Sequence, residues 1–441
     1  MKQISKSERK IPQESILEVQ SALAAIRKKL LGKRLNYKEI YAIMDSIATK
    51  KLGDVLTTYF AASGYSKGFT NQELFYLTKA MVATGDQLHF KGVVADKHSI
   101  GGIPGTRTTL VIVPIVAAAG FTIPKSSSRA ITTPGGTADD MELLAPVNLS
   151  KKEVYSAVKK TNGCIVWGGS FHIAPADDII IRVEEPLLLE SYDKILVSIM
   201  AKKIAFGSTH VVIDLPYGDS VKVHRLKDAQ FLKEKFEYLA KKFDIKIRCL
   251  IHKTDEPFGR GIGPILETRE SLRVLEQGKN RPIDLEIRSL HLAGNLLELC
   301  LEDSAKKLRE EIKKKYGNGI GWATHILQSG LALKKMKEII KAQGGNPNVN
   351  SNHLKPGRFS YGITSHKKGT VKKINSHVAT VITKTLGAPK SKGAGIYIHK
   401  KIGESVEKKE ALCTLYSESA SLLAQVKQSL PNLTVFEITN T

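Results

Sequence analysis

The spacing of apolar residues predicts helices through the first part of the chain, from about residue 14 to residue 84. Apolar side chains recur there every three or four positions, as one face of a helix requires. Asn36 precedes Glu39 by three residues, and Thr70 has the same relation to Glu73. This is the spacing of a capping box, which opens an amphipathic helix. We therefore expect a helical N-terminal region.

The pattern changes in the middle of the chain, where short apolar runs alternate with helical spacing. Thr109–Val116 and Val211–Leu215 are β-rich apolar runs, which predict buried strands. Residues 245–251 alternate apolar and polar side chains, which predicts a half-buried strand. Helical spacing separates these runs at 190–205 and at 228–243. Strands separated by helices indicate an α/β layer.

The last part of the chain contains many turn-forming residues and few long segments with a regular apolar spacing. Gly259–Pro264 (GRGIGP) precedes a helix-like segment, but the third glycine of a dinucleotide-binding fingerprint is missing. We interpret it as a structural turn between a strand and a helix. Residues 344–358 are rich in Gly, Pro and Asn, which predicts a linker. Short β-like segments beyond it predict a small α+β unit over residues 355–441.

Composition and charge narrow the classes of protein. The chain has 441 residues, of which 42% are hydrophobic, so it can bury the cores of two or three domains. Its formal net charge of +24 fits nucleic-acid binding, an acidic small substrate or a lysine-rich solvated surface. The lysines are dispersed and only 6% of residues are aromatic, so we favour the solvated surface over nucleic-acid binding.

The lack of a recognisable targeting segment and the spacing of the cysteines lead us to expect a cytoplasmic protein. No apolar run reaches the length of a membrane span, and the polar N-terminus lacks the apolar segment of a signal peptide. The four cysteines are scattered, without a C-x-x-C pair. This spacing argues against a disulfide framework or a zinc site and favours a reducing compartment.

The candidate chemistry is concentrated between Asp96 and Glu142. Lys97 and Ser99 follow a short apolar run in DKHSIGG, where the end of a strand would let both contact an anion. The P-loop pattern is absent from this segment. The alternative is a tight loop with a surface lysine, and His98 taken alone favours a structural role.

A second group of donors lies in SSSRAITTPGGTADD. Arg129 and the Gly135–Gly136 pair are surrounded there by hydroxyl side chains, namely those of Ser126, Ser127, Ser128, Thr132, Thr133 and Thr137. Such donors beside an arginine fork suit phosphate or carboxylate, and a solvated polar loop is the alternative. Asp139 and Asp140 would cap a helix that begins there.

Two later segments support weaker hypotheses. Asp177 and Asp178 are adjacent and point to different sides of one element, so we interpret Asp177 as a helix cap and not as a metal ligand. Ser198 and Lys202 stand four residues apart on one predicted helix. Their shared face either presents a pair of donors to a ligand or is simply exposed.

These segments, in this order, resemble the thymidine and pyrimidine-nucleoside phosphorylase family. The likeness is greatest to its branch of AMP phosphorylases and type-2 thymidine phosphorylases, and it extends over nearly the whole chain. It rests on the motifs IRKKLLGKRLNYKEI, DKHSIGG, SSRAITTPGGTAD, WGG, APADD, AKK, PFGRGIGPILE, AQGGNP and GAPKSKGAGI.

The resemblance implies an α/β protein of the nucleoside phosphorylase class II type. An all-helical domain would face a larger α/β domain, with the active site in the cleft between them. The helical domain would span residues 1–88, with 174–206 returning to it. The α/β phosphate-binding domain would span 89–173 and 207–345, and a small α+β C-terminal unit would span 355–441.

The resemblance also implies residue roles. It assigns the attacking phosphate to Lys97, Ser99, Thr109, Ser127 and Thr137. It assigns the base to His98, Arg182, Ser198 and Lys202. The nucleotide site of the AMP phosphorylases corresponds to Gly102, Ser128, Arg129, Ala130, Ile131, Thr132, Thr133, Thr137, Ser198 and Lys222. The predicted catalytic residues are Lys97, His98 and Glu190, the last at the position of a proton donor that is usually aspartate in that branch.

The implied reaction is phosphorolysis of a nucleoside or a nucleoside 5′-monophosphate, with inorganic phosphate as co-substrate and no metal or organic cofactor. A 5′-phosphate would contact Arg129 and Lys222. AMP phosphorylases carry an extra N-terminal domain associated with higher assembly, and this chain begins close to the helical domain, so we expect a homodimer through that domain. Two alternatives are transfer of the anthranilate-phosphoribosyltransferase type, which needs a magnesium site, and non-catalytic nucleic-acid binding.

Overall fold

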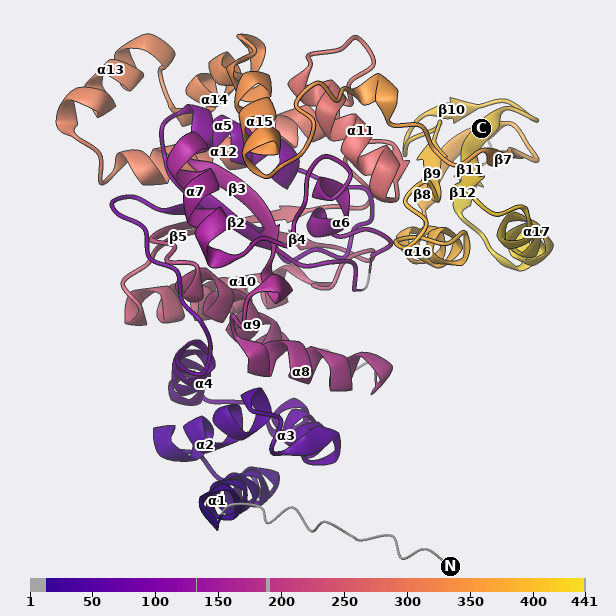
Figure 1. The fold of residues 1–441 in the computed structure, drawn as a ribbon. Helices are drawn as coiled ribbons and strands as arrows, with labels where there is room; N and C mark the ends of the chain where they lie inside the picture. Colours follow the sequence, from indigo (N-terminus) through magenta and orange to yellow (C-terminus); the bar gives the residue numbers. More distant parts are fainter. Residues whose placement is uncertain (1–12, 132, 188–190, 440–441) are drawn as a thin grey trace, which may run out of the picture. The chain divides into compact units, whose positions relative to one another are not determined.

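A computed structural model describes residues 13–131, 133–187 and 191–439 of the protein (Figure 1). Thr132 and Glu190, both assigned to the site above, therefore lie outside the described residues. The chain divides into two compact units. Unit 1 combines residues 1–87 with 172–205, and unit 2 combines residues 88–171 with 206–441.

The regular elements described in unit 1 are all helices. They are α1 (Gln13–Leu30), α2 (Tyr37–Ala48), α3 (Gly53–Lys67), α4 (Asn71–Ala83), α8 (Pro175–Glu184), the short 3₁₀ helix η2 (Glu185–Leu187) and α9 (Tyr192–Ala205). Both predicted capping boxes are confirmed. Asn36 accepts the Glu39 N–H at 3.0 Å, and Thr70 accepts the Glu73 N–H at 3.2 Å. These hydrogen bonds satisfy donors that have no partner within the helix.

The α/β part of unit 2 is built on parallel strands. They are β1 (Ala95–Ser99), β2 (Ile123–Ser127), β3 (Gly163–Trp167), β4 (His210–Tyr217) and β5 (Lys246–Lys253). β1 pairs with β4, β4 with β5, and β2 with β3. A parallel bridge from Val94 to Thr122 joins the two sets in the order β3-β2-β1-β4-β5. The predicted strands at 211–215 and 245–251 are confirmed.

Helices of unit 2 cover this sheet, and their apolar side chains form the hydrophobic core of the α/β part. They are α5 (Thr109–Ala118), α6 (Thr137–Met141), α7 (Lys151–Thr161), η1 (Gly168–Ser170), α10 (Leu226–Lys242), α11 (Pro264–Leu275), α12 (Ile283–Leu301), α13 (Lys306–Tyr316), α14 (Gly319–Gln328), α15 (Leu331–Ala342) and η3 (Ser351–His353). α5, α12, α14 and α15 pack against one another around a large apolar cluster (Figure 1). Among the described helices, none combines the length and apolar character needed to cross a membrane.

The prediction of a strand over Thr109–Val116 is wrong, because this run forms helix α5. All its residues from Thr109 to Ala117 are buried, so the helix lacks the polar face that would reveal its period. An apolar run of this length fits a buried strand or a buried helix equally well by pattern. Pro114 lies inside the run and has no N–H for a strand ladder.

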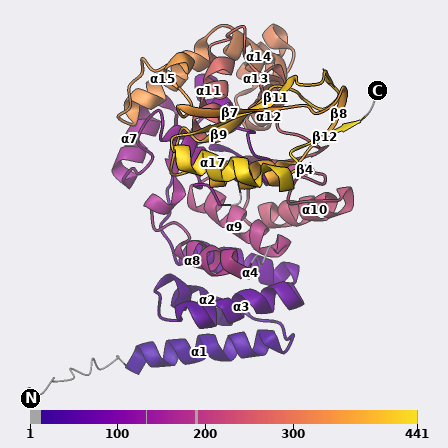
Figure 2. The same ribbon diagram turned by 90° about the vertical axis from the view of Figure 1, so that its right-hand side faces the viewer.

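The C-terminal part of unit 2 contains antiparallel sheets. Its elements are β6 (Gly261–Ile262), β7 (Phe359–Thr364), β8 (Gly369–Ile374), α16 (Ser376–Thr385), β9 (Gly395–Ile398), β10 (Ser405–Val406), β11 (Ala411–Ser417), α17 (Ala420–Ser429), η4 (Leu430–Asn432) and β12 (Phe436–Thr439). The sheet orders are β6-β9-β11-β7 and β10-β8-β12. Helix α17 lies against β7 and β11 (Figure 2). The short strand β6, in the predicted turn before α11, pairs with β9 and joins the two parts.

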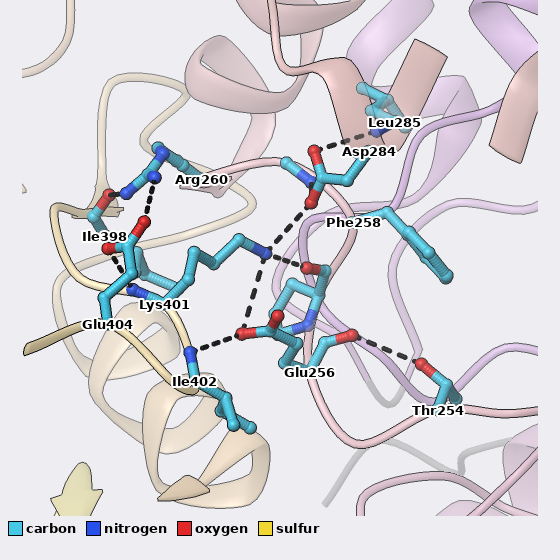
Figure 3. A network of polar contacts seen from close by, with 12 residues as sticks. Thr254, Glu256, Phe258, Arg260, Asp284, Leu285, Ile398, Lys401, Ile402 and Glu404 are labelled. Atoms are coloured by element: carbon cyan, nitrogen blue, oxygen red, sulfur yellow. Dashed lines mark hydrogen bonds and ion pairs between the residues drawn. The ribbon is translucent and has the colours of Figure 1, made fainter. Parts of the chain in front are cut away.

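Polar contacts add to this junction. The Lys401 ammonium lies 3.1 Å from Asp284 and 3.8 Å from Glu256, and it also donates to the Pro257 carbonyl (Figure 3). The Glu256 carboxylate accepts the Ile402 N–H at 3.0 Å. The segment that follows β5 is thereby held by the C-terminal part of unit 2.

Candidate active site

Lys97 is the middle residue of β1 and is almost fully buried, with 3% of its surface exposed. Its ammonium donates to the Thr108 hydroxyl at 2.7 Å. Burial lowers the pKa of Lys97 to about 8, with Arg288 and Arg107 acting in the same direction and Asp214 and Asp96 against it. A buried cation with one neutral hydrogen-bond partner is suited to attract an anion.

Asp214 occupies the same edge of the sheet on the neighbouring strand, paired in register with Ser99. Its carboxylate accepts the Ser99 hydroxyl at 2.7 Å and contacts the Arg288 guanidinium. Burial would raise the pKa of Asp214, but Arg288, Lys97 and His252 together lower it. Arg288 also donates to Nδ1 of His252 at 2.7 Å, and burial lowers the pKa of that imidazole to about 4. His252 is therefore neutral at physiological pH.

Helix α5 begins beside this cluster. Thr108 is its N-cap residue and Thr109 its first residue, both buried. The first N–H groups of a helix have no partner within the helix and carry the positive end of its dipole. With the Lys97 ammonium on the Thr108 hydroxyl, the turn before α5 combines a positive charge with hydroxyl and backbone donors, the donor set of a phosphate site.

The loop between β2 and α6 folds back on itself through Asp139. The Asp139 carboxylate accepts the N–H groups of Ala130 at 2.7 Å and Gly136 at 3.0 Å. A Cβ on Gly136 would lie 2.4 Å from the carbonyl carbon of Arg129, so this close approach requires glycine. The sequence assigns helix capping to Asp139 and Asp140, and of the two only Asp139 has such a role, from within α6.

Asp140 instead belongs to a buried ion cluster. Its carboxylate contacts the Arg107 guanidinium, which also contacts Glu267 on α11 and donates to the Gly135 carbonyl. Burial raises the pKa of both carboxyls and would lower that of Arg107, but the two acids hold the Arg107 pKa above its usual value. Arg107 thereby ties the turn before α5 to the loop before α6.

Arg129 is engaged within the protein. Its two terminal nitrogens donate to Glu142 at 2.8 and 2.6 Å, one of them also to Asp139 at 3.2 Å, and its guanidinium lies 5.1 Å from the Trp167 ring. Lys392, from the segment before β9, lies 3.0 Å from Glu142. Hydrogen bonds from Arg129 and Lys392 lower the pKa of Glu142 to about 2.

Two further contacts shape the region. Lys384 on α16 donates to the Ile131 carbonyl at 2.8 Å, so the C-terminal part of unit 2 touches the β2–α6 loop. Gly102 has a φ of 105°. A Cβ there would lie 2.9 Å from the Lys222 nitrogen, so the segments at 102 and 222 pack closely.

In unit 1, Ser198 and Lys202 on α9 do share a face, and they converge on Asp177. The Asp177 carboxylate accepts the Ser198 hydroxyl at 2.8 Å and lies 2.6 Å from the Lys202 ammonium. The interpretation of Asp177 as a helix cap is therefore wrong, because it lies in the first turn of α8 and its carboxylate faces α9. Burial would lower the pKa of Lys202, but Asp177 and Asp178 raise it above its usual value.

Arg182 does not join this group. Its guanidinium forms a bidentate pair with Asp54 on α3, at 2.8 and 2.6 Å, and its side chain is 60% exposed. Asp54 thus holds it elsewhere on unit 1.

The predicted residues of unit 2 gather at one edge of the sheet. Because the carboxyl ends of neighbouring parallel strands share an edge, Lys97 and Ser99 lie on the same side of the sheet as Ser127. The loop from Ser128 to Thr137 follows there, with Ala130, Ile131 and Thr133 all partly exposed. His98 lies between Lys97 and Ser99 on β1 and is half-buried.

Sequence reasoning missed several residues of this region, namely Arg107, Thr108, Asp214, Lys384 and Lys392. Asp214 carried a signal, since it is an acid inside the apolar run VVIDL, at the carboxyl end of a predicted strand. Lys384 carried none, because it lies far along the chain and only the fold brings it near. Lys392 lies in the motif GAPKSKGAGI, but the motif alone does not show that this lysine contacts Asp139.

Family models match three parts of the chain. The helical bundle domain of the glycosyl transferase family matches residues 23–85, and the a/b domain of that family matches residues 91–332. The pyrimidine nucleoside phosphorylase C-terminal domain matches residues 370–436.

Curated relatives align over most of the chain. The AMP phosphorylase of Thermofilum pendens is 44% identical over 411 residues, covering 93% of this chain and 77% of that protein. A protein of Legionella pneumophila named "Putative thymidine phosphorylase" is 44% identical over 403 residues, covering 91% and 75%. Among solved structures, anthranilate phosphoribosyltransferase from Thermus thermophilus matches with a TM-score of 0.57 and 18% identity, covering 72% of this chain and 99% of that one. The last likeness shows the fold alone.

Proposed function

The chain belongs to the thymidine and pyrimidine-nucleoside phosphorylase family, and from this premise we propose that it is a phosphorolytic pentosyltransferase. It would cleave the N-glycosidic bond of a nucleoside or a nucleoside 5′-monophosphate. A phosphate oxygen forms a bond to the anomeric carbon while the carbon–nitrogen bond breaks. The base leaves with the bonding electrons and a proton, and a sugar 1-phosphate remains.

The observation that carries this proposal is the buried Lys97 on β1, whose ammonium reaches the turn before α5 at Thr108. Phosphate is already an anion, so it needs positioning more than activation, and fixed donors supply this without reorganisation. The Lys97 ammonium, the Thr109 hydroxyl and the first N–H groups of α5 are such donors. The Ser99 hydroxyl would join them by turning its single proton from Asp214 to the phosphate. Ser127 and Thr137 would add two more from the neighbouring loop. Asp214 keeps the Ser99 hydroxyl oriented and raises the pKa of Lys97 against the effect of burial.

The departing base needs donors of its own, because negative charge develops on it in the transition state. We assign this role to the Lys202 ammonium, which has further donors beside the one facing Asp177, and to the Ser198 hydroxyl once it turns from Asp177 to the base. His98 would be a further base contact and Glu190 the proton donor. Arg182 would join them only after leaving its pair with Asp54. Asp177 supports the first two, since it fixes both side chains through one carboxylate.

We propose a 5′-monophosphate as the preferred substrate, with Lys222 as the contact to its phosphate. Arg129 is the weaker candidate for this contact, because Glu142 and Asp139 already take its terminal nitrogens. Arg129 would instead hold the shape of the loop that carries Ser128 and Thr133. The packing of Gly102 against the Lys222 backbone places Lys222 next to the DKHSIGG turn.

Base release measured by chromatography tests the reaction. The protein would be offered thymidine, uridine, AMP, CMP and GMP, each with and without inorganic phosphate. We expect phosphate-dependent release from a monophosphate. Release from thymidine or uridine alone would leave phosphorolysis in place and overturn the substrate preference. No release from any of them would overturn the proposal in favour of phosphoribosyl transfer or nucleic-acid binding.

Lys222→Ala tests the contact to the 5′-phosphate. We expect kcat/KM for AMP to fall about tenfold or more, because a charge-assisted hydrogen bond is lost, while the rate with adenosine stays unchanged. Lys227→Ala, an exposed lysine on α10, is the matched control for the loss of one positive charge. Equal losses for AMP and adenosine would contradict the assignment.

We also propose that the protein is a cytoplasmic homodimer, associated through unit 1, and that it needs no metal or organic cofactor. Unit 1 exposes large apolar side chains, among them Leu31 at 74% and Val55 at 70% of their surface. Apolar surface of this kind favours association between subunits. Light scattering would give the mass in solution, and activity after dialysis against a chelator would test the absence of a metal.

A further inference from the structure

A second cationic site lies in unit 2, in a cavity of about 490 Å³. Its walls come from helix α11, from the segments just before β6 and α12, and from strands β9 and β11 with the residue that follows β9. The lining includes Arg260, Arg269, Arg273, Arg281, Tyr397 and Tyr416. None of these residues belongs to the phosphate or base sites proposed above.

Two of the four arginines are neutralised by carboxylates. Arg260 lies 2.9 Å from Glu404, as Figure 3 shows, and also donates to the His399 carbonyl at 2.5 Å. Arg281 forms an ion pair with Glu286. These contacts fix both side chains against the cavity wall.

The other two have no such partner. Among the described residues, no carboxylate lies within ion-pair distance of Arg269 or Arg273, although both line the cavity. Glu270 is next to them, but its carboxylate accepts the backbone N–H groups of Arg260 and Gly261 instead. Glu270 therefore offsets the charge of Arg269 and Arg273 only in part, which leaves the cavity with an excess of positive charge.

Arg269 and Arg273 also stand four residues apart on α11, which brings like charges together on one helix face. Nε of Arg269 is buried and has no hydrogen-bond partner among the described residues. Its guanidinium lies 5.7 Å from the Tyr397 ring, and burial together with Arg273 lowers its pKa. A bound anion that contacts the terminal nitrogens of both arginines would offset this repulsion.

We propose that this cavity is a binding site for a small anion that carries two or more phosphate groups. Arg269 and Arg273 would each offer a planar fork to a phosphate, and the Tyr397 and Tyr416 side chains provide aromatic surface beside them. The shared chemistry fits a nucleoside polyphosphate or an inorganic polyphosphate. This site does not depend on the proposed phosphorolysis.

Isothermal titration calorimetry at fixed ionic strength tests the site, with tripolyphosphate, pyrophosphate and ADP as separate probes. The protein, the Arg269→Gln/Arg273→Gln variant and the Lys97→Gln variant are compared. We expect binding to weaken at least about tenfold in the double variant, because two charge-assisted contacts are lost. Binding should persist in Lys97→Gln, whose change lies in the other cluster. ADP binding more tightly than pyrophosphate would identify the nucleotide as the ligand, and equal binding would identify the phosphates alone.

A matched control removes two charges elsewhere. Lys279→Gln/Lys334→Gln has the same net charge as the double arginine variant and does not alter the lining of the cavity. An equal loss in this control would overturn the proposal, as would full retention in the arginine variant. If the arginine variant does not fold, phenylglyoxal labelling of the unmodified protein replaces it. Tripolyphosphate should then protect Arg269 and Arg273 from the reagent, and unchanged labelling would overturn the site.

Discussion

The described part of unit 2 contains two clusters of cationic side chains, one around the buried Lys97 and one around the half-buried Arg269 and Arg273, and they differ in what balances the charge. Around Lys97, the acids Asp214 and Asp140 contact the arginines Arg288 and Arg107 within the fold. In the cavity beside α11, Arg269 and Arg273 face each other's charge with no carboxylate in ion-pair distance among the described residues.

The difference indicates what each cluster is built for. In the first, carboxylates fix the positions of several donors, which is what a site for a reacting phosphate needs. In the second, the charge remains available to a ligand that arrives with its own counter-charge. Removing a cation from the first cluster should therefore lower the free energy of unfolding. Removing cations from the second cluster should leave that free energy constant or raise it slightly.

The largest effect is expected from Arg107→Met. This change leaves Asp140 and Glu267 buried without their cation, and such a break typically costs about 3–5 kcal/mol of unfolding free energy. Urea denaturation would measure it. Arg182→Met, which breaks an exposed pair, should leave stability nearly unchanged. If Arg107→Met lowered the free energy of unfolding as little as Arg182→Met, the ion pairs of Arg107 with Asp140 and Glu267 would not be needed for stability.

Lys97→Gln should have the next largest effect, on activity. The variant keeps a hydrogen-bond donor near Thr108 but loses the charge, so we expect kcat/KM for phosphate to fall about a hundredfold or more. Thr108→Val removes only the hydroxyl that orients Lys97 and should have a smaller effect of the same kind. Steady-state rates measured over a range of phosphate concentrations would give kcat and KM for both variants. An unchanged KM for phosphate and an unchanged kcat would remove Lys97 from the site.

The pH profile tests the charge state of Lys97. Because burial lowers its pKa to about 8, the ammonium is protonated below that pH and neutral above it. Phosphate binding should therefore weaken as pH rises through about 8, approaching tenfold per pH unit. Asp214→Asn removes a charge that raises this pKa, so the decline should begin at lower pH. Lys97→Gln should abolish it. A decline that persists in Lys97→Gln would assign the titration to another group.

Local patterns in the sequence predicted much of this fold. Capping boxes at Asn36 and Thr70 were predictable because each depends on residues three positions apart. Helix α5 was not, because a run buried on all sides loses the polar face that marks its period. In the candidate site, the DKHSIGG and SSRAITTPGGTAD segments were visible as clusters of donors. The partners that hold them, such as Asp214, Lys384 and Lys392, come from distant segments, and Asp177 was misassigned because its contacts with α9 are tertiary.

The smallest effect, and the sharpest contrast, is expected from Arg269→Met/Arg273→Met. Methionine keeps most of the apolar stem of each side chain. The change removes two like charges one helical turn apart and a buried donor that has no hydrogen-bond partner in the part of the chain that the structure describes. Like charges at this spacing destabilise a helix by about 0.2–0.5 kcal/mol, so unfolding free energy should stay constant or rise slightly. Urea denaturation of this variant and of Arg107→Met, measured side by side, compares their free energies of unfolding directly. A loss comparable to that of Arg107→Met would show that these arginines have structural partners, and the cavity would then resemble the Lys97 cluster instead of contrasting with it.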